Sequence, residues 1–186
     1  MNGTNRWEVI LAGAGGQGLQ LAGTLLGQAA VEYEGRFACQ LQSFGVASRG
    51  GYAHAEVVIA DGEIAYPGVT EPDWVVILSQ MAYDRLVPGL PPKSRVLYDA
   101  DRVVPGESGP GSIGLPLSST AIRAEAERSV NLVALGALAS LAQPVGIEAL
   151  ERTIMGRLGS SAVRAFTAGV RLAETERRGN RSLGSD

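Results

Sequence analysis

The chain contains very little cysteine and no excess of basic charge, and each scarcity excludes a class of function. Cys39 is the only cysteine among 186 residues. This excludes an internal disulfide, and it excludes an iron–sulfur cluster or a four-cysteine zinc site built from this chain alone. The 16 basic and 19 acidic residues are spread along the sequence and give a net charge of −3. Without a basic stripe, no nucleic-acid partner is expected.

Long apolar runs are also missing. No run approaches the ~18 residues that a membrane-spanning helix needs, and residues 1–6 lack the apolar segment of a signal peptide. We therefore expect no membrane association and a cytoplasmic location. Histidine is equally scarce, because His54 is the only one. It falls in a predicted strand with no Asp, Ser or Cys pattern that would tie it to a catalytic triad, which favours a structural role.

What is present fits one α/β domain. A chain of 186 residues that is 45% hydrophobic can bury a full core without dividing. We expect that domain over residues 1–177, and a flexible tail over residues 178–186, where apolar residues are few. The predicted fold class is a single Rossmann-like, three-layer α/β domain with a mixed sheet flanked by helices.

The strands are predicted from short apolar runs. An apolar run ends at a glycine cluster and is followed by helical spacing from Leu19, which predicts a strand, a turn and a helix. Asp61-Gly62 predicts a tight turn between two antiparallel strands, at residues 53–59 and 63–66. Residues 105–114, rich in Gly, Pro and Ser, are expected to form a surface loop. The strands expected outside the hairpin are 9–12, 37–41, 74–78 and 95–99, of which the last two should be buried and parallel. Cys39 should be a small buried apolar residue.

The helices are predicted from alanine and leucine at helical spacing. One short helix is expected over residues 80–86, and four more over residues 121–127, 130–141, 147–158 and 162–174. The helix at 130–141 is apolar on more than one side, so it is either a core helix or a subunit-contact helix. Asn131, at its start, is either a cap or a buried hydrogen-bonding residue.

Gly13, Gly15 and Gly18 match the G-x-G-x-x-G pattern between a predicted strand and a predicted helix. In that context, backbone amides and a helix N-terminus can face an anion. A nicotinamide dehydrogenase would carry an acidic residue roughly 20 positions further on, but residues 37–43 contain no carboxylate. A plain tight turn that permits close packing remains an alternative.

A second motif makes the pattern more specific. Gly15-Gly16-Gln17-Gly18, followed by Ala22-Gly23, occurs together with Ser43-Phe44-Gly45 and Ser48-Arg49-Gly50-Gly51. The combination resembles the gamma subunit of the 2-oxoacid:ferredoxin oxidoreductases, and the resemblance spans about residues 9–169. Ala47 departs from it, because many relatives carry an acidic residue there.

The resemblance implies one subunit of a larger enzyme. In such a complex, alpha and beta subunits bind thiamine diphosphate and decarboxylate a 2-oxoacid. Electrons then pass through iron–sulfur clusters of ferredoxin-like subunits to ferredoxin, and coenzyme A takes the acyl group. This chain would bind no cofactor by itself and would be inactive alone, although it could form a homodimer in isolation. The resemblance leans toward the 2-oxoglutarate type, and pyruvate, ketoisovalerate and indolepyruvate types remain open.

The resemblance places the site where the glycine loop and the Ser48–Gly51 segment meet. No catalytic residue or metal ligand is expected in this chain alone. Arg49 could hold a carboxylate or phosphate of the 2-oxoacid or coenzyme A as a bidentate clamp. In the alternative of a purely structural scaffold subunit, the same residues would touch only neighbouring subunits. The expected contact residues are Gly13, Gly15, Gly16, Gln17, Gly18, Ser43, Arg49, Gly50 and Gly51.

Overall fold

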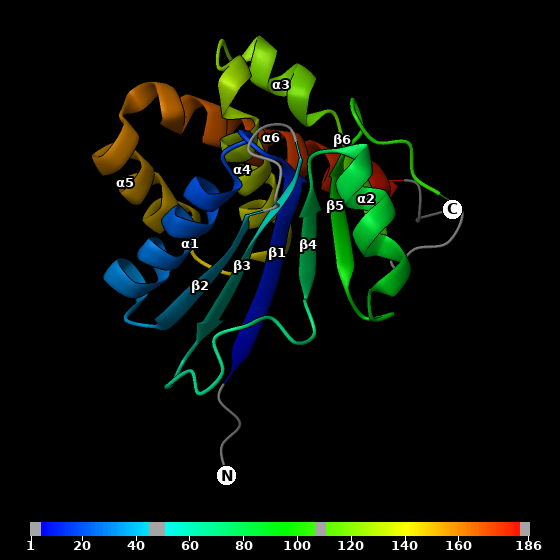
Figure 1. Ribbon diagram of the computed structural model, residues 1–186. Coiled ribbons are helices and arrows are strands. Elements are labelled where there is room, and N and C mark those ends of the chain that lie inside the picture. The colour runs from blue at the N-terminus through cyan, green and yellow to red at the C-terminus, as the bar shows by residue number, and fades with distance from the viewer. Residues whose placement is uncertain (1–4, 45–50, 107–110, 183–186) are drawn as a thin grey trace.

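A mixed sheet with helices on both faces forms the body of the molecule (Figure 1). The computed structural model describes residues 5–44, 51–106 and 111–182, with the backbone alone placed for residues 43, 44 and 180–182. The described part forms one α/β domain, which confirms the predicted fold class.

Six strands make up the sheet, in the spatial order β2-β3-β1-β4-β5-β6. β3 pairs antiparallel with both β1 and β2, whereas β1, β4, β5 and β6 run parallel to one another. The predicted parallel pair, β4 and β5, is confirmed. The strands are β1 Arg6–Ala14, β2 Phe37–Phe44, β3 Tyr52–Ala60, β4 Trp74–Ile77, β5 Arg95–Asp99 and β6 Ser112–Leu115.

The helices follow the predicted order, with shifts at some ends. α3 begins and ends earlier than predicted, and α6 continues into the segment expected to be a tail. None of the described helices is long and apolar enough to cross a membrane. The helices are α1 Leu19–Glu34, α2 Gln80–Leu86, α3 Leu117–Arg123, α4 Val130–Ala142, α5 Ile147–Leu158 and α6 Ser160–Ser182, with 3-10 turns η1 Val87–Gly89 and η2 Glu127–Ser129.

One strand prediction and one loop prediction are wrong. Residues 63–66 form no strand, so β3 has no hairpin partner across Asp61-Gly62 and pairs instead with β1 and β2. The expected loop over residues 105–114 contains the start of β6, whose Ser112 lies beside Val96 of β5. Both errors concern pairings with strands that are distant in the sequence.

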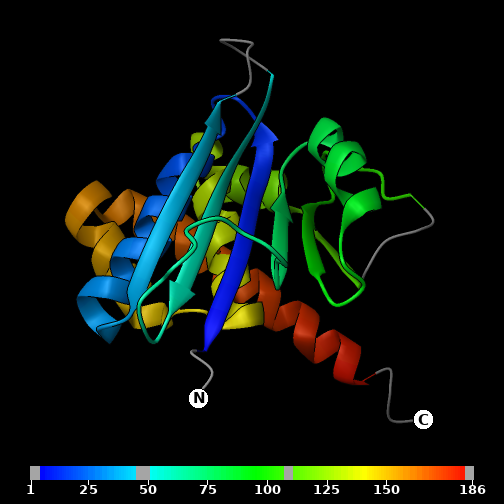
Figure 2. The same ribbon diagram turned by 60° about the horizontal axis from the view of Figure 1, so that its bottom comes forward.

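The alternation of side chains along the strands builds a core on each face of the sheet. Val9 and Leu11 of β1 belong to the buried cluster that contains residues of α1, α3, α4, α5 and α6, whereas Ala12 belongs to the cluster that contains residues of α2 on the opposite face. α2 covers only part of its face. Beyond it, residues 61–73 cross β3 and β1 (Figure 2).

α4 and α6 cross at van der Waals distance because each carries a glycine at the crossing. A β carbon built on Gly136 would overlap the carbonyl oxygen of Phe166, and one on Gly169 would overlap that of Val133.

Ten of the thirteen α4 residues, Asn131 through Ser140, are buried. α4 is therefore a core helix, and the alternative of a subunit-contact helix does not hold within this chain.

Candidate functional site

The glycine loop joins the end of β1 to the start of α1 and is closed by its own glutamine. The Gln17 side chain accepts a hydrogen bond from the amide of Ala14 at 2.6 Å and donates one to the carbonyl of Leu78 at 3.0 Å. The backbone amide of Gln17 donates to the carbonyl of Ala14 at 3.2 Å. Gly16 and Gly18 take positive φ angles of 93° and 72°, which glycine adopts without strain. The amides of Ala14 and Gln17 are thus engaged within the protein.

The structure brings the two sequence motifs together. The Gly15 amide donates to the carbonyl of Gly51 at 2.8 Å, and the neighbouring Ala14 pairs with Tyr52 in the β1–β3 ladder. Ser43 lies opposite His54 in the β2–β3 ladder. Arg49 and Gly50 lie outside the described residues, so their contact with ligand stays a prediction.

Asn131 ties the glycine loop to the first turn of α4. Its side-chain amide donates to the carbonyl of Gly18 at 3.0 Å, and only 4% of the residue is exposed. A β carbon on Gly18 would lie 2.5 Å from Asn131 Nδ2, so the close approach requires glycine. Of the two roles expected for Asn131, the structure shows the buried hydrogen-bonding one.

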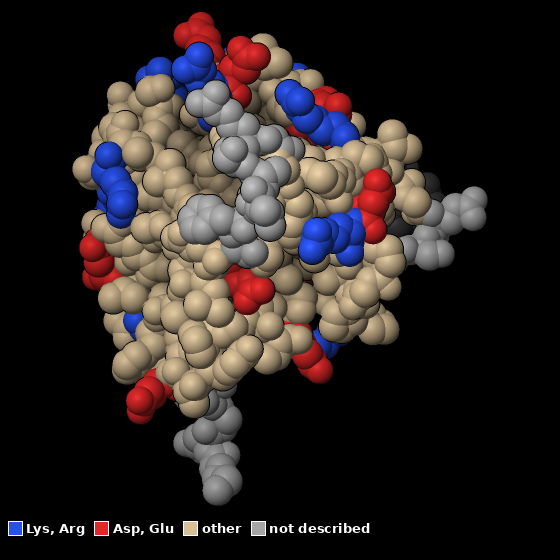
Figure 3. Space-filling model, in the orientation of Figure 1, with Lys and Arg blue, Asp and Glu red and all other residues tan. Residues whose placement is uncertain are grey.

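A cavity of about 430 Å³ opens beside this loop, at the carboxyl edge of the sheet. Sequence reasoning named only two of its lining residues, Gly16 and Gln17. The others come from the segment after β5 and from the region of α3, η2 and α4: Arg102, Ser118, Ile122, Glu127, Arg128 and Val130. Basic and acidic side chains gather along the same upper edge of the molecule, over α3 and its neighbours (Figure 3).

A buried carboxylate positions one of the two cavity arginines. Asp99, fully buried at the end of β5, accepts hydrogen bonds from the amides of Leu117 and Ser118, and from Ser118 Oγ at 2.5 Å. Arg102 Nε in turn donates to Ser118 Oγ at 3.2 Å. Polar residues at the carboxyl ends of parallel strands commonly line sites, so Asp99, the last residue of β5, was a signal for this edge of the sheet, although it does not by itself identify Arg102.

The cavity can bind an anion, but it contains no pair of groups arranged for proton transfer. Two guanidinium groups with backbone and hydroxyl donors suit phosphate or carboxylate oxygens, and Glu127 supplies the only carboxylate of the lining. No group of three or more potential metal ligands occurs among residues 5–44, 51–106 and 111–182. The arrangement favours binding and orientation over covalent chemistry.

His54 and Cys39 lie on the sheet, apart from this cavity. His54 Nε2 is 3.5 Å from Glu56 Oε1, and the His54 ring contacts that of Tyr52 with centroids 5.2 Å apart. These contacts agree with the structural role expected for the histidine. Cys39 is only partly buried and so is less buried than expected, because it lies on β2 at one edge of the sheet.

The family model of the pyruvate ferredoxin/flavodoxin oxidoreductases matches residues 8–173. The chain belongs to this family. The 2-oxoglutarate synthase subunit KorC of Methanocaldococcus jannaschii is 39% identical over 154 residues, which cover 81% of this chain and 82% of that protein. The match confirms the resemblance drawn from the glycine loop and the Ser48–Gly51 segment, and makes this chain a gamma-type subunit of a 2-oxoacid:ferredoxin oxidoreductase.

Solved structures show the same fold. The gamma subunit of a keto/oxoacid ferredoxin oxidoreductase from Geobacter sulfurreducens is 32% identical with a TM-score of 0.82, and the match covers 92% of this chain and 98% of that one. The 2-oxoglutarate:ferredoxin oxidoreductase of Magnetococcus marinus, solved with 2-oxoglutarate, coenzyme A and succinyl-CoA, is 25% identical with a TM-score of 0.83. That match covers 91% of this chain but 31% of the Magnetococcus chain.

Proposed function

We propose that this gamma subunit serves a complex that oxidises 2-oxoglutarate to its acyl-CoA, and that it forms part of the wall past which coenzyme A approaches the active site. The name of the Methanocaldococcus relative and the ligands of the Magnetococcus enzyme support the 2-oxoglutarate assignment. Thiamine diphosphate and the iron–sulfur clusters would be held by the alpha, beta and ferredoxin-like subunits, with ferredoxin as the electron acceptor. The single cysteine of this chain fits that division, since a cluster needs several.

The observation that carries the proposal is the cationic cavity next to the two family motifs. Arg102 and Arg128 line it together with Gly16 and Gln17, and the Gly15–Gly51 hydrogen bond holds the second motif beside the same loop. Coenzyme A is a phosphorylated nucleotide, and a guanidinium group can bind two phosphate oxygens through two parallel hydrogen bonds. A volume of about 430 Å³ lies within the range of small-molecule sites, and it holds part of coenzyme A while a neighbouring subunit completes the enclosure.

Each residue in this account binds or orients and none performs the chemistry. Arg102, fixed through Ser118 to Asp99, contacts a phosphate. Arg128, in η2 just before α4, adds a second positive charge. Arg49, in the segment between β2 and β3, clamps a carboxylate or a further phosphate. The bound thiamine diphosphate of the neighbouring subunits supplies the decarboxylation.

Single substitutions in the assembled complex test the proposal. Arg102→Gln and Arg128→Gln should each raise the KM for coenzyme A about tenfold, because a hydrogen bond to a charged group contributes roughly 1.5–3 kcal/mol, reduced by solvent at an exposed site. Arg178→Gln, on α6 and outside this cavity, is the matched control and should leave both Michaelis constants unchanged. If the cavity variants also leave both constants unchanged, the scaffold role is favoured and the wall role fails.

Two further measurements separate the remaining alternatives. Initial rates with 2-oxoglutarate, pyruvate, ketoisovalerate and indolepyruvate should be highest for 2-oxoglutarate, and a higher kcat/KM for another acid would overturn the substrate assignment. The isolated chain should not bind NADH tightly, since residues 37–43 offer no carboxylate for the ribose. Tight NADH binding would revive the independent dehydrogenase.

A further inference from the structure

A second cavity, of about 560 Å³, lies between α6 and the turn that follows α3. We call it the arginine groove and define it by Arg123, Glu125, Arg164, Thr167, Ala168 and Arg171. It shares no lining residue with the cavity at the glycine loop. Nothing in the proposed role of that first cavity accounts for it.

The positive charge of the groove is not neutralised from within the described chain. Among the described residues, no carboxylate lies within 4.0 Å of the guanidinium of Arg164, Arg171 or Arg123. Arg123 donates to the hydroxyl of Thr120 at 2.7 Å. The lining therefore carries three positive charges against the single negative charge of Glu125, on a protein whose net charge is −3. An excess of this kind attracts a negatively charged partner.

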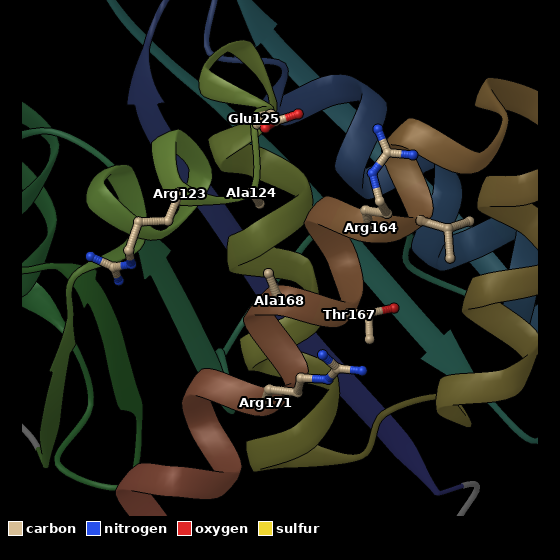
Figure 4. Close-up of a pocket in the computed structure, with 8 residues that line it drawn as sticks. Arg123, Ala124, Glu125, Arg164, Thr167, Ala168 and Arg171 are labelled. Carbon is tan, nitrogen blue, oxygen red and sulfur yellow. The ribbon is translucent and has the colours of Figure 1, made fainter.

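The spread of the charges selects the kind of partner. Figure 4 shows the three guanidinium groups separated: that of Arg123 points away from α6, and those of Arg164 and Arg171 extend from different turns of α6. Arg164 and Arg171 are seven residues apart on one helix, roughly 10 Å along its axis. Groups that bind one phosphate converge on a point, whereas these are spaced to meet several carboxylates along an extended surface.

The apolar part of the groove lining, which we call its floor, is partly exposed. It consists of Val163, Ala124 and Ala168, which are neither buried nor fully exposed and which line the groove together with the arginines. Small apolar residues with arginines at their margin are typical of protein–protein interfaces, where arginine is enriched. The chemistry of the floor thus agrees with a polypeptide as the occupant.

We propose that the arginine groove docks an acidic segment of another polypeptide of the same oxidoreductase complex. In the Magnetococcus enzyme the matching region makes up only 31% of its chain, so there the same fold is covalently joined to the rest of the polypeptide. In the Methanocaldococcus KorC subunit, by contrast, the matching region makes up 82% of the protein, and a gamma-type subunit of that length needs non-covalent contacts in place of that link. The inference rests on the chain working as a subunit of that complex, and it does not depend on where coenzyme A binds.

Charge reversal at the groove tests the docking. Arg164→Glu/Arg171→Glu should weaken the binding of this chain to the remaining subunits of its complex about tenfold or more, because like charges then face each other. The matched control is Arg152→Glu/Arg178→Glu, which reverses two exposed arginines outside the groove and should change the Kd less than about threefold. Equal unfolding midpoints for the two isolated double variants would show that the groove variant still folds.

Salt and assembly measurements decide among the occupants. The wild-type Kd should rise between 50 and 300 mM NaCl more steeply than that of the groove variant, as expected for exposed ion pairs. An unchanged Kd for the groove variant overturns the inference. The inference is also overturned if the groove variant still joins the complex normally but the isolated chain no longer self-associates. That result would assign the groove to a second copy of this chain. Saturable binding of pyrophosphate to the isolated wild-type chain that the groove variant lacks would assign it to a small anion.

The experiments distinguish the docking inference from the coenzyme A proposal, so that either can fail without the other. At subunit concentrations that saturate assembly, the groove variant should keep the wild-type KM for coenzyme A. If it raises that KM while the Kd for assembly is unchanged, the docking inference fails and the groove becomes a substrate contact. If the Kd rises and Arg102→Gln leaves the KM unchanged, the docking stands without the wall role.

Discussion

The side-chain amide of Gln17 occupies the space that a side chain on Gly13 would need. A β carbon built on Gly13 would collide with Gln17 Oε1, the same atom that accepts the hydrogen bond from the Ala14 amide. The first glycine of the G-x-G-x-x-G pattern therefore makes room for an internal glutamine. This accounts for a pattern that resembles a dinucleotide fingerprint in a chain that lacks the ribose-binding carboxylate.

Gln17→Ala should lower the free energy of unfolding by about 1–3 kcal/mol, because it leaves the Ala14 amide and the Leu78 carbonyl without their partner in a partly buried place. Gln80 is a matched control, since its side chain makes the same pair of bonds with the backbone of Val104, and those bonds are exposed to solvent. Gln80→Ala should lower it by less than about 1 kcal/mol. Urea unfolding of the two variants measures the difference, and equal losses would contradict the account of the loop.

Gly169→Ala should destabilise the protein by about 1–3 kcal/mol or more, because the new methyl group would overlap backbone of α4 that cannot move alone. Gly156→Ala is the control on α5, where a β carbon would meet nothing within 4 Å. That change should raise stability by about 0.5–1 kcal/mol, since alanine loses less backbone entropy in a helix. Thermal unfolding of both variants should give shifts of opposite sign, and a Gly169→Ala midpoint at or above that of the wild type would refute the close crossing.

Ionised Glu8 should stabilise the folded protein, and part of the loss of stability in acid should come from its protonation. Burial acts to raise the pKa of the Glu8 carboxyl, but hydrogen bonds from the Glu71 amide, from Arg6 and from the Thr70 amide outweigh it and hold that pKa below 4.5. The stabilisation from the lowered pKa is present above about pH 4.5, and it is lost as the pH falls through the folded-state value.

The Glu8→Gln variant checks this pH dependence. It should be less stable than the wild type at pH 7, and the gap should narrow as the pH falls below about 4.5, where the wild-type carboxyl takes up a proton. Glu32→Gln, an exposed control, should leave the pH profile of the unfolding free energy close to that of the wild type. A constant gap between wild type and Glu8→Gln from pH 7 to pH 3 would show that Glu8 does not contribute through its charge.

The order of elements followed from local signals in the sequence, but the course of residues 61–73 did not. Asp61-Gly62 favours a hairpin locally. In the folded chain, however, Glu8 accepts hydrogen bonds from the amides of Thr70 and Glu71, and Glu56 accepts one from the amide of Val69. Glu8 lies on β1, 62 residues before Thr70 in the sequence, and Glu56 lies on β3. Tertiary contacts of this kind outweigh the local preference of four residues, and no periodicity reveals them.

The candidate site divides in the same way. The glycine loop and its neighbour Gly51 could be predicted because each is a contiguous motif and the structure joins them through Gly15. Arg102 and Arg128 could not, because they meet the loop only after β5, α3 and η2 are in place. Arginines in surface segments give no local sign of what they will face, so the cationic character of the cavity emerges only from the fold.

Hydrogen–deuterium exchange on the assembled complex, with and without coenzyme A, tests the central claim most directly. The account predicts that coenzyme A slows exchange at the amides of residues 14–20 and 117–130 of this chain, while α5, which contributes no residue to the cavity lining, is unchanged. Protection confined to the other subunits, with no change at either segment, would contradict a gamma subunit that forms part of the coenzyme A approach.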